Sequence, residues 1–336
     1  MTTFELPDGR RVALIGDPHL GKDFDKHAPP ARRGQRSTMQ MAQFYDELRA
    51  DAEVIIMVGD LFDHPRVSDG VVIGAAHAVR FMAEAWPDKT FIMMAGNHDM
   101  PRNLTSVGAW TKFTKMLEDR RPNLHIVRRP AVINDVAVFP WEWDRSALEQ
   151  VEDVRSETPL AAVGHWDLEL FDGDGKHMAP TKALHEAFGK IGIYSGHFHT
   201  PGVYTVDGID VVCTGSMQPI SHGEDPDKSL YITVTMDELN NMRPCDYYNK
   251  HVRVLVKPGE EIPDLNCLGV SHKRLVEESE THQGVISPAS FDWTERLAQR
   301  ISTLSQPVQD FIIERIPDAD PQKQRRGGAS ADLESV

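Results

Sequence analysis

Five short apolar runs in the first 200 residues end at or just before a glycine that introduces Asp, Asn or His. The runs cover residues 12–15, 54–58, 91–95, 161–164 and 191–194. The sequences at their ends are GDPH at 16–19, GDLFD at 59–63, GNHD at 96–99, GH at 164–165 and GHFH at 196–199. Apolar runs of this length are typical of buried strands, and glycine lets the backbone turn sharply where a strand ends. The chain is therefore expected to deliver similar polar side chains from five separate strands.

The segments between the first three runs have the spacing of helices. Ser37 and Ser68 are candidate N-caps, because a serine hydroxyl can accept a hydrogen bond from the first turn of a helix. The apolar residues that follow recur at helical spacing: Met41, Phe44, Tyr45 and Leu48 after the first cap, and Val72, Ala75, Val79 and Met82 after the second. This alternation of strand and helix predicts an α/β fold with a largely parallel sheet.

The pattern changes after residue 130. Residues 132–139 and 203–213 read as hairpins with the two-residue turns Asn134-Asp135 and Asp207-Gly208. Residues 230–234 and 252–256 would add further strands. A parallel first half is therefore expected to be followed by a more antiparallel second half.

The polar clusters at the five strand ends are candidate metal ligands. In open α/β sheets ligands gather beyond the carboxyl ends of the strands, so the clusters should meet at one rim. The candidate ligands are Asp17, His19, Asp60, Asn97, His165, His197 and His199. Seven ligands are too many for one tetrahedral zinc, and two ions that share a carboxylate fit the number better. Donor sets of carboxylate, amide and imidazole without thiolate suit Mn²⁺, Fe²⁺ or Zn²⁺.

A pair of divalent ions predicts hydrolysis of a phosphoester, because two ions can clamp the attacking and leaving oxygens. His98 stands beside Asn97 but is not needed to complete the ligand set. It is a candidate proton donor to the leaving group, with Asp99 orienting its ring. Asp63 is open to two interpretations, a metal ligand or a carboxylate that anchors a loop.

The five clusters resemble the motifs of the calcineurin-like metallophosphoesterases. Three features are similar to SbcD/Mre11-type DNA nucleases: the Leu20-Gly21 pair after Asp-x-His, the Phe-Asp of GDLFD at 59–63, and TGSMQPISHGEDPDKSLYIT at 214–233. FPWEW at 139–143, VGHWDL at 163–168 and SGHFHT at 195–200 are similar to the recombination exonuclease subunits of T4-like phages. The resemblance extends from residue 11 to about residue 235 and implies a four-layer α/β/β/α sandwich with a small C-terminal cap and C-terminal helices.

The resemblance also implies how the ligands are shared. Asp17, His19, Asp60 and His199 would hold one Mn²⁺, and Asp60, Asn97, His165 and His197 would hold the other, with Mg²⁺, Fe²⁺ or Zn²⁺ as alternatives. His98 would act on the scissile phosphodiester. The implied activities are 3′-to-5′ exonuclease and single-strand endonuclease, in DNA recombination, repair or end processing. Pro18 departs from the aromatic that these nucleases usually carry there, so stacking of that side chain on substrate is not expected.

The net charge of −15 runs against a DNA substrate, because affinity for the phosphate backbone comes from Lys and Arg. Metal ions, basic patches or a partner could offset it. The candidate substrate contacts are Lys22, Arg32, Arg33 and Arg102. Arg36, Arg120, Arg121, Arg128 and Arg129 form further basic groups. For these groups, solvated surface charge is an equally good interpretation.

Four segments are expected along the chain: a nuclease domain at 1–236, a small cap at 237–290 that contacts DNA, a helical segment at 291–316 and a disordered tail at 317–336. The apolar stripe at 291–316 suits either packing on the core or helix-in-groove docking. By resemblance, the partner would be an SbcC/Rad50-type ATPase and the nuclease a homodimer within a heterotetramer.

The compartment is expected to be the cytoplasm, of the host if the chain is phage-encoded. The first residues, MTTFELPDGRRV, have no apolar core of a secretory signal, and no apolar run approaches the length of a membrane span. Three cysteines without CxxC spacing, Cys213, Cys245 and Cys267, favour neither disulfides nor a zinc knuckle.

Two other functions compete with the nuclease. One is a phosphomonoesterase or cyclic-nucleotide phosphodiesterase of the same superfamily, which the Met-Pro-Arg after GNHD disfavours. The other is a scaffold that binds metal without catalysis, which the presence of every ligand and of His98 disfavours.

Overall fold

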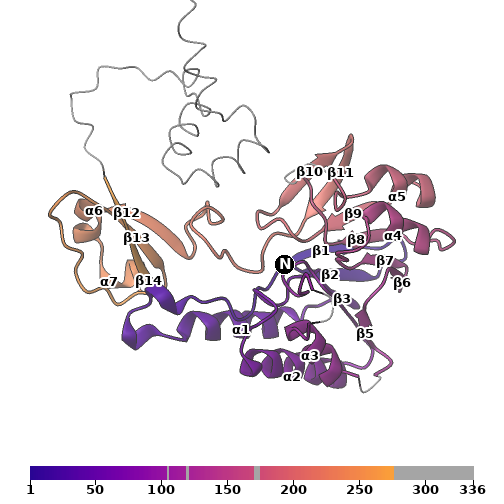
Figure 1. Cartoon of the computed structure of the whole chain (residues 1–336), viewed down its shortest axis with the longest axis horizontal. Helices are drawn as coiled ribbons and strands as arrows, with labels where there is room; N and C mark the ends of the chain where they lie inside the picture. Colours follow the sequence, from indigo (N-terminus) through magenta and orange to yellow (C-terminus); the bar gives the residue numbers. More distant parts are fainter. Residues whose placement is uncertain (104–105, 119–120, 170–174, 276–336) are drawn as a thin grey trace, which may run out of the picture. The chain divides into compact units, whose positions relative to one another are not determined.

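The computed structural model describes residues 1–103, 106–118, 121–169 and 175–275 (Figure 1). Residues Met1–Leu275 form one compact unit. No helix among these residues combines the length and hydropathy that crossing a membrane requires. The predicted helical segment at 291–316 and tail at 317–336 lie outside the described residues, as does the end of the predicted cap, so those predictions stay as they are.

The first sheet has five strands in the order in which they occur along the chain. They are β1 (Thr2–Glu5), β2 (Arg11–Ile15), β3 (Val54–Met57), β4 (Thr90–Met94) and β5 (Leu124–Val127). Strands β2 to β5 are parallel, which confirms the prediction for this half, and β1 is an antiparallel edge strand. The helices of this half are α1 (Gln35–Glu47), α2 (Asp69–Ala85) and α3 (Ala109–Met116).

The second sheet has six strands in the order β10-β11-β9-β8-β7-β6. They are β6 (Ala131–Ile133), β7 (Val136–Phe139), β8 (Ala161–Gly164), β9 (Gly192–Ser195), β10 (Gly202–Val206) and β11 (Ile209–Cys213). Both predicted hairpins are present at its edges, and their turn residues Asn134, Asp135, Asp207 and Gly208 all have positive φ, as type I′ turns require. The four inner strands are parallel, so this half is mixed rather than mainly antiparallel.

The two sheets stack face to face, with helices on both outer sides. Alternate residues of a strand point to opposite faces. In β2, Val12 and Leu14 join the core between the sheets, whereas Ala13 and Ile15 pack in the core that includes α1, α2 and α3. A third core lies between the second sheet and helices α4 (Ala147–Asp153) and α5 (Thr181–Phe188). The expected four-layer α/β/β/α sandwich is confirmed.

The two predicted helix starts differ in outcome. Ser68 is the N-cap residue of α2, although its side chain makes no capping hydrogen bond. Helix α1 instead begins at Gln35, with Gly34 in the left-handed region as its N-cap, so the expectation for Ser37 is wrong. Two short 3₁₀ turns, Asp25–His27 and Pro30–Arg32, run almost directly into α1 and advance its start.

A third, smaller sheet follows, with β12 (Tyr231–Thr235), β13 (His251–Val256) and β14 (Gly269–Arg274) all parallel. Helices α6 (Met236–Asn241) and α7 (Pro244–Tyr247) connect its first two strands. The sheet has its own apolar core, which includes Leu239, Val252, Val254 and Cys267. It therefore starts a few residues before the predicted cap.

Candidate metal centre

The rim beyond the strand ends collects every candidate ligand. Asp17 and His19 follow β2, Asp60 follows β3, Asn97 follows β4, His165 follows β8, and His197 and His199 follow β9. Within the described residues, potential metal-binding donors cluster here in three overlapping groups: Asp17, His19 and His199; His19, Asp60 and His98; Asp60, His165 and His197. Strands from both sheets thus supply one site.

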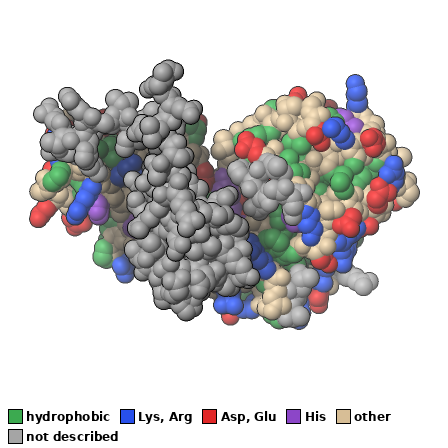
Figure 2. All heavy atoms as spheres, turned by 45° about the horizontal axis from the view of Figure 1, so that its top comes forward, with side chains coloured by type: hydrophobic (Ala, Val, Ile, Leu, Met, Phe, Trp, Pro, Cys, Tyr) green, Lys and Arg blue, Asp and Glu red, His purple; other side chains and the backbone are tan. Residues whose placement is uncertain are grey.

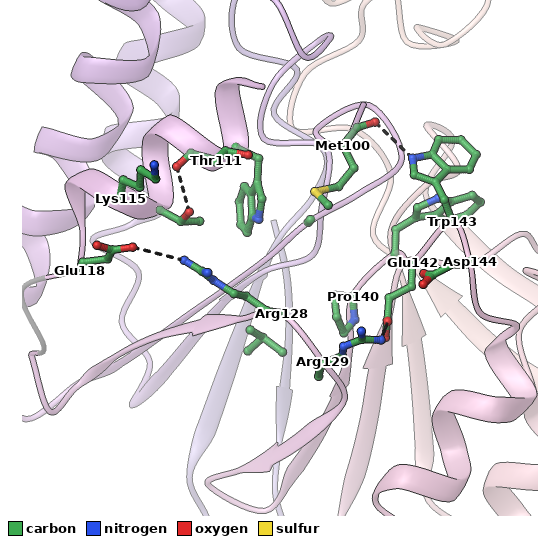
Figure 3. A pocket seen from close by; sticks show the side chains of 15 residues that line it. Met100, Thr111, Lys115, Glu118, Arg128, Arg129, Pro140, Glu142, Trp143 and Asp144 are labelled. Atoms are coloured by element: carbon green, nitrogen blue, oxygen red, sulfur yellow. Dashed lines mark hydrogen bonds and ion pairs between the residues drawn. The ribbon is translucent and has the colours of Figure 1, made fainter. Parts of the chain in front are cut away.

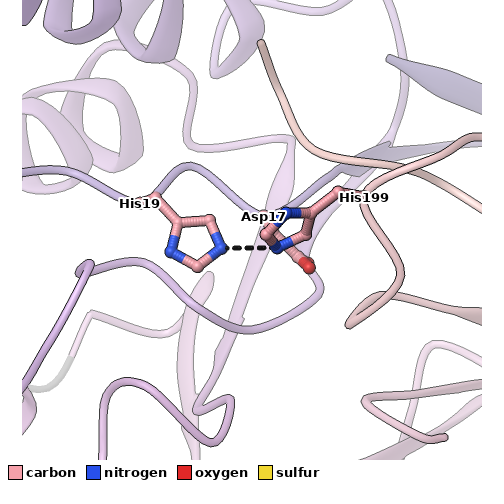
Figure 4. A group of neighbouring side chains, drawn as sticks. All are labelled: Asp17, His19 and His199. Atoms are coloured by element: carbon pink, nitrogen blue, oxygen red, sulfur yellow. Dashed lines mark hydrogen bonds between the residues drawn. The ribbon is translucent and has the colours of Figure 1, made fainter. Parts of the chain in front are cut away.

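The first group places two imidazoles edge to edge. Nε2 of His19 lies 2.9 Å from Nε2 of His199, and Asp17 lies beside this pair (Figure 4). Oδ2 of Asp60 is 3.7 Å from Nε2 of His19. These donors agree with the set expected for one ion.

The group of Asp60, His165 and His197 surrounds the side-chain oxygen of Asn97. This oxygen lies 3.0 Å from Nε2 of His165 and 3.0 Å from Nδ1 of His197. Oδ1 of Asp60 is 3.5 Å from Nε2 of His165. Because Asp60 reaches donors in both groups, its carboxylate stands where two ions would share a ligand.

Three imidazoles of the rim turn their second nitrogen toward an acceptor outside the group, whereas Nδ1 of His19 has no hydrogen-bond partner among the described residues. Nδ1 of His165 donates to the Val58 carbonyl at 2.9 Å. Nε2 of His197 lies 2.8 Å from Asp167, and Nδ1 of His199 lies 3.2 Å from Glu224. Such partners fix the tautomer and ring orientation of metal-binding histidines, so the inward nitrogens are left free to bind a cation.

Asp167 and Glu224 are functional candidates that the sequence did not single out. The available signal was Asp167 two residues after His165, but nothing in the sequence pairs it with His197. Asp63, left open at the sequence level, lies 3.5 Å from Nδ1 of His19 and 3.1 Å from Lys22. It belongs to none of the three donor groups of the described residues, so it anchors a ligand rather than acting as one.

The carboxylates of the rim are deeply buried and incompletely paired. Asp17 and Asp60 are 0% and 1% exposed, and one oxygen of each has no hydrogen-bond partner among the described residues. Burying an unpaired charge is costly. Burial raises the pKa of Asp17 to about 7. The residues therefore fit bound cations, which would satisfy these oxygens.

His165 and Asp60 shift each other's protonation in opposite directions. Burial alone would lower the pKa of His165, but the charge of Asp60 raises it to about 9. Burial would raise the pKa of Asp60, but His165 lowers it below its usual value. Without an ion the two groups form a charged pair, so a cation would replace the proton on His165.

The backbone of the rim is strained at the ligands. His19, Asp60 and His197 have φ angles of 46°, 48° and 76°, in the left-handed region that non-glycine residues rarely adopt. Strain of this kind concentrates at functional sites. A Cβ on Gly96 would lie 2.1 Å from Oδ1 of Asp60, and one on Gly59 2.3 Å from Nδ1 of His165. These two strand-exit glycines make room for the ligands.

His98 is exposed at the edge of the site, and its ring centroid lies 4.9 Å from that of His19. Nδ1 of His98 lies 2.6 Å from the carbonyl oxygen of Asp63, which can only accept, so the proton sits on Nδ1. The expectation that Asp99 orients this ring is wrong. The Asp99 carboxylate is fully buried and accepts the backbone N–H groups of Gly96, Leu61 and Phe62.

Three of the four candidate substrate contacts are accessible, and the fourth is buried. Lys22 lies near the centre through its ion pair with Asp63, and Arg102 and Arg33 are exposed. Arg32 is only 3% exposed, and its guanidinium donates to the Tyr248 carbonyl at 2.7 Å while lying 3.8 Å over the Tyr248 ring. The expectation for Arg32 is therefore wrong, because this side chain joins the loop before α1 to the third sheet.

One protein family and two known proteins are similar to this chain. Residues 10–201 match the model of the calcineurin-like phosphoesterase family. Over 200 residues the chain is 24% identical to "Exonuclease subunit 1" of Enterobacteria phage T4; the match covers 56% of this chain and 55% of that protein, so the chain spans about half the length of this relative. A dimetal phosphatase from Danio rerio aligns with a TM-score of 0.37 and 13% identity over 61% of this chain and 87% of its own.

The family match includes every strand end of the rim from Asp17 to His199, and the fold and donor groups described above agree with it. Members of such a family hydrolyse phosphoesters with metal ions. The chain belongs to the calcineurin-like phosphoesterases.

Proposed function

We propose that this protein is a metal-dependent DNA nuclease that hydrolyses phosphodiester bonds. The observation that carries the proposal is the shared position of Asp60 between two donor groups, with the exposed His98 beside them. The phage T4 relative is named an exonuclease subunit, which supports DNA as the substrate. We propose Mn²⁺ as the metal and recombination, repair or end processing as the setting, from resemblance alone.

The chemistry follows from the two donor groups and His98. A pair of divalent ions supplies Lewis acidity that activates water and offsets charge on the phosphate oxygens. Since the Asp63 carbonyl holds the proton on Nδ1 of His98, only Nε2 can exchange a proton with substrate. In its charged form His98 would donate that proton to the leaving oxygen. Its exposure allows a polymer to reach it.

On the face drawn in Figure 2, basic and acidic side chains are interspersed, so this view identifies no separate basic surface for DNA. Lys22 and Arg102 are the basic candidates nearest the centre, through Asp63 and through the segment after His98. A protein of net charge −15 therefore needs its bound cations to attract the phosphate backbone.

The partner proposal concerns residues outside those that the structure describes. We propose that residues 291–316 dock an SbcC/Rad50-type ATPase and that the nuclease works as a dimer in the cytoplasm. Deleting 287–336 should spare Mn²⁺-dependent cleavage and abolish co-purification with the ATPase. An insoluble truncated protein would instead show that the segment packs on the core.

One assay set tests the nuclease. Linear duplex and single-stranded DNA are offered with Mn²⁺, beside a small phosphomonoester and a small phosphodiester. The wild type should cleave DNA, and His98→Ala should lose roughly 10²–10⁴-fold in rate while still binding metal. His77→Ala, an exposed histidine on α2, is the matched control.

Two results would replace the proposal. Cleavage of the phosphomonoester or of the small phosphodiester without cleavage of DNA would identify a phosphomonoesterase or cyclic-nucleotide phosphodiesterase, the first alternative. Metal binding without cleavage of any ester would identify a scaffold.

A further inference from the structure

A pocket of about 270 Å³ lies beside the metal centre, between helix α3 and the ends of β4, β5 and β7 (Figure 3). Its inner surface is apolar and aromatic and includes Ala95, Trp110, Val127 and Trp141, which are 3–7% exposed. The mechanism proposed above makes no use of it. A cavity of this size and lining suits a flat aromatic ligand.

The mouth of the pocket is charged. Lys115 approaches from α3, and Arg128 and Arg129 follow β5, with side chains of the two arginines that are 61% and 62% exposed. Glu118 lies 3.8 Å from Arg128 (Figure 3), and the buried Glu142 pairs with Arg129. Asp144 also lines the pocket, so basic and acidic side chains are equal in number there, and it is the aromatic interior that fits a base.

Trp141 joins the pocket to the metal centre. Its ring centroid lies 5.5 Å from that of His197 and 6.0 Å from that of His165. Its backbone N–H donates to the Ala95 carbonyl at 2.9 Å, two residues before the ligand Asn97. Trp141 therefore lies between the pocket and the candidate ligands His165 and His197.

Trp143 links the pocket to a candidate phosphate contact. Its indole N–H donates to the Met100 carbonyl at 3.2 Å, and the Arg102 guanidinium lies 5.3 Å from its ring centroid. Both Met100 and Trp143 line the pocket. A strand that meets Arg102 would thus have a base within reach of the pocket.

We propose that this pocket binds one unpaired base of the DNA strand next to the scissile phosphate. The inference rests on the proposed nuclease function and names the part of the substrate that the enzyme recognises. Base stacking on aromatic side chains tolerates any sequence and contributes enough affinity to change rates severalfold to a hundredfold. The pocket would therefore favour single strands and frayed ends without selecting a sequence.

The test fills the pocket from one position. Thr111→Phe places a ring in it, and Thr111→Ser is the matched control that keeps it open. Thr111→Phe should lower kcat/KM on single-stranded DNA about tenfold more than kcat/KM on a small phosphodiester that has no base. An oligonucleotide with an abasic residue beside the cleaved bond should reduce the wild-type rate and remove the difference between the two variants.

A second pair of variants guards against a folding defect. Lys115→Ala removes a cation at the mouth, whereas Lys112→Ala removes a lysine of the same helix that pairs with Asp69 instead. Only the first should weaken DNA cleavage relative to hydrolysis of the small ester.

Binding is measured apart from cleavage. A single strand with 2-aminopurine at its end is titrated with His98→Ala protein, and the 2-aminopurine fluorescence should change on binding. The fluorescence change should be smaller with the double variant His98→Ala/Thr111→Phe. Equal rates and equal fluorescence for both Thr111 variants would overturn the pocket while leaving the nuclease intact. If the wild type does not cleave DNA, the nuclease proposal fails and the fluorescence titration alone decides the pocket.

Discussion

The two sheets of the sandwich contribute different chemistry to one rim. Three of the four donors from the first sheet are oxygen ligands, Asp17, Asp60 and Asn97, and both carboxylates keep an unpaired buried oxygen. The three donors from the second sheet, His165, His197 and His199, are imidazoles whose outer nitrogens face a carbonyl or a carboxylate. One sheet therefore supplies charge, and the other supplies orientation.

This difference shows what holds each half in place without an ion. The imidazoles are positioned by protein partners, so their geometry does not depend on metal. The carboxylates are held by backbone contacts, such as the His98 N–H on Oδ1 of Asp60 at 2.8 Å, but one buried oxygen of each has no hydrogen-bond partner among the described residues. Metal affinity should then depend most on the first sheet, and metal geometry on the second.

The largest effect should come from the shared carboxylate. Asp60→Asn should lower phosphodiester hydrolysis by roughly 1,000-fold or more, above the 10–100-fold that outer partners contribute, because both ions lose a ligand. Isothermal titration with Mn²⁺ should show the loss of at least one bound ion. Asp46→Asn, an exposed carboxylate on α1, is the control.

Asp60→Asn also tests the buried pair with His165. Removing the partner of the charged His165 should lower the melting temperature of the metal-free protein, and the wild type should gain more than the variant on addition of Mn²⁺. A variant that binds two ions normally would contradict the shared position of Asp60.

Changes to the carboxylates that orient the histidines should have a smaller effect on metal binding. Asp167→Asn and Glu224→Gln should each weaken Mn²⁺ binding by about 10–100-fold, because His197 and His199 lose the acceptors that fix their rings. Glu169→Gln, which changes an exposed carboxylate, serves as the control. Equal losses for Asp167→Asn and Asp60→Asn would remove the distinction between charge and orientation.

A substitution at a strand-exit glycine of the first sheet should have a smaller effect, on stability. Gly96→Ala should destabilise the protein by about 1–3 kcal/mol, because its Cβ would overlap Oδ1 of Asp60. Gly70→Ala, at a position with open space around the added Cβ, should be neutral or stabilising by up to about 1 kcal/mol. Denaturant unfolding of the metal-free proteins compares the two.

The smallest effect concerns a buried histidine that lies in no donor group of the described residues. His251 in β13 is 8% exposed, stacks on Tyr231 and faces the cations or potential cations Arg36, His222 and His27. Burial and these neighbours lower its pKa to about 3. Ligand histidines have carboxylates beside them, whereas this one does not, so it stays neutral without an ion.

His251 should therefore make the fold sensitive to acid. With a pKa of about 3 in the fold and about 6.5 when unfolded, only the unfolded chain takes up the proton between these values, so stability falls as the pH drops below 6.5. The wild type should lose about 1 kcal/mol relative to His251→Phe between about pH 7.5 and pH 6. Denaturant unfolding of the two proteins at both pH values measures this difference.

Local signals explain what the sequence predicted well. The apolar runs, the exit glycines and the Asp-Gly and Asn-Asp turns depend on residues close together in the chain, so the strands, both hairpins and the ligand positions were predictable. Strands β1 and β14 were missed. The sequence of β14, GVSHKR, is mostly polar and gains its place by pairing with β13.

The residue roles that the sequence did not predict depend on tertiary contacts. Arg32 reaches Tyr248, 216 residues away, and the carboxylate of Asp99 bonds to Leu61, 38 residues away. Neither partner is marked in the sequence, where a surface arginine and a carboxylate beside a histidine have simpler interpretations. The outer partners Asp167 and Glu224 were missed for the same reason.

The Asp99 carboxylate has a further consequence for metal exchange. By accepting N–H groups of Gly96, Leu61 and Phe62, it ties the loop after β3 to the loop after β4 before any ion arrives. An ion then enters a site whose loops are already joined, and its binding does not have to supply the free energy that orders them. The rate of metal uptake should therefore be limited by dehydration and access, and losing the ion should leave these loops in place.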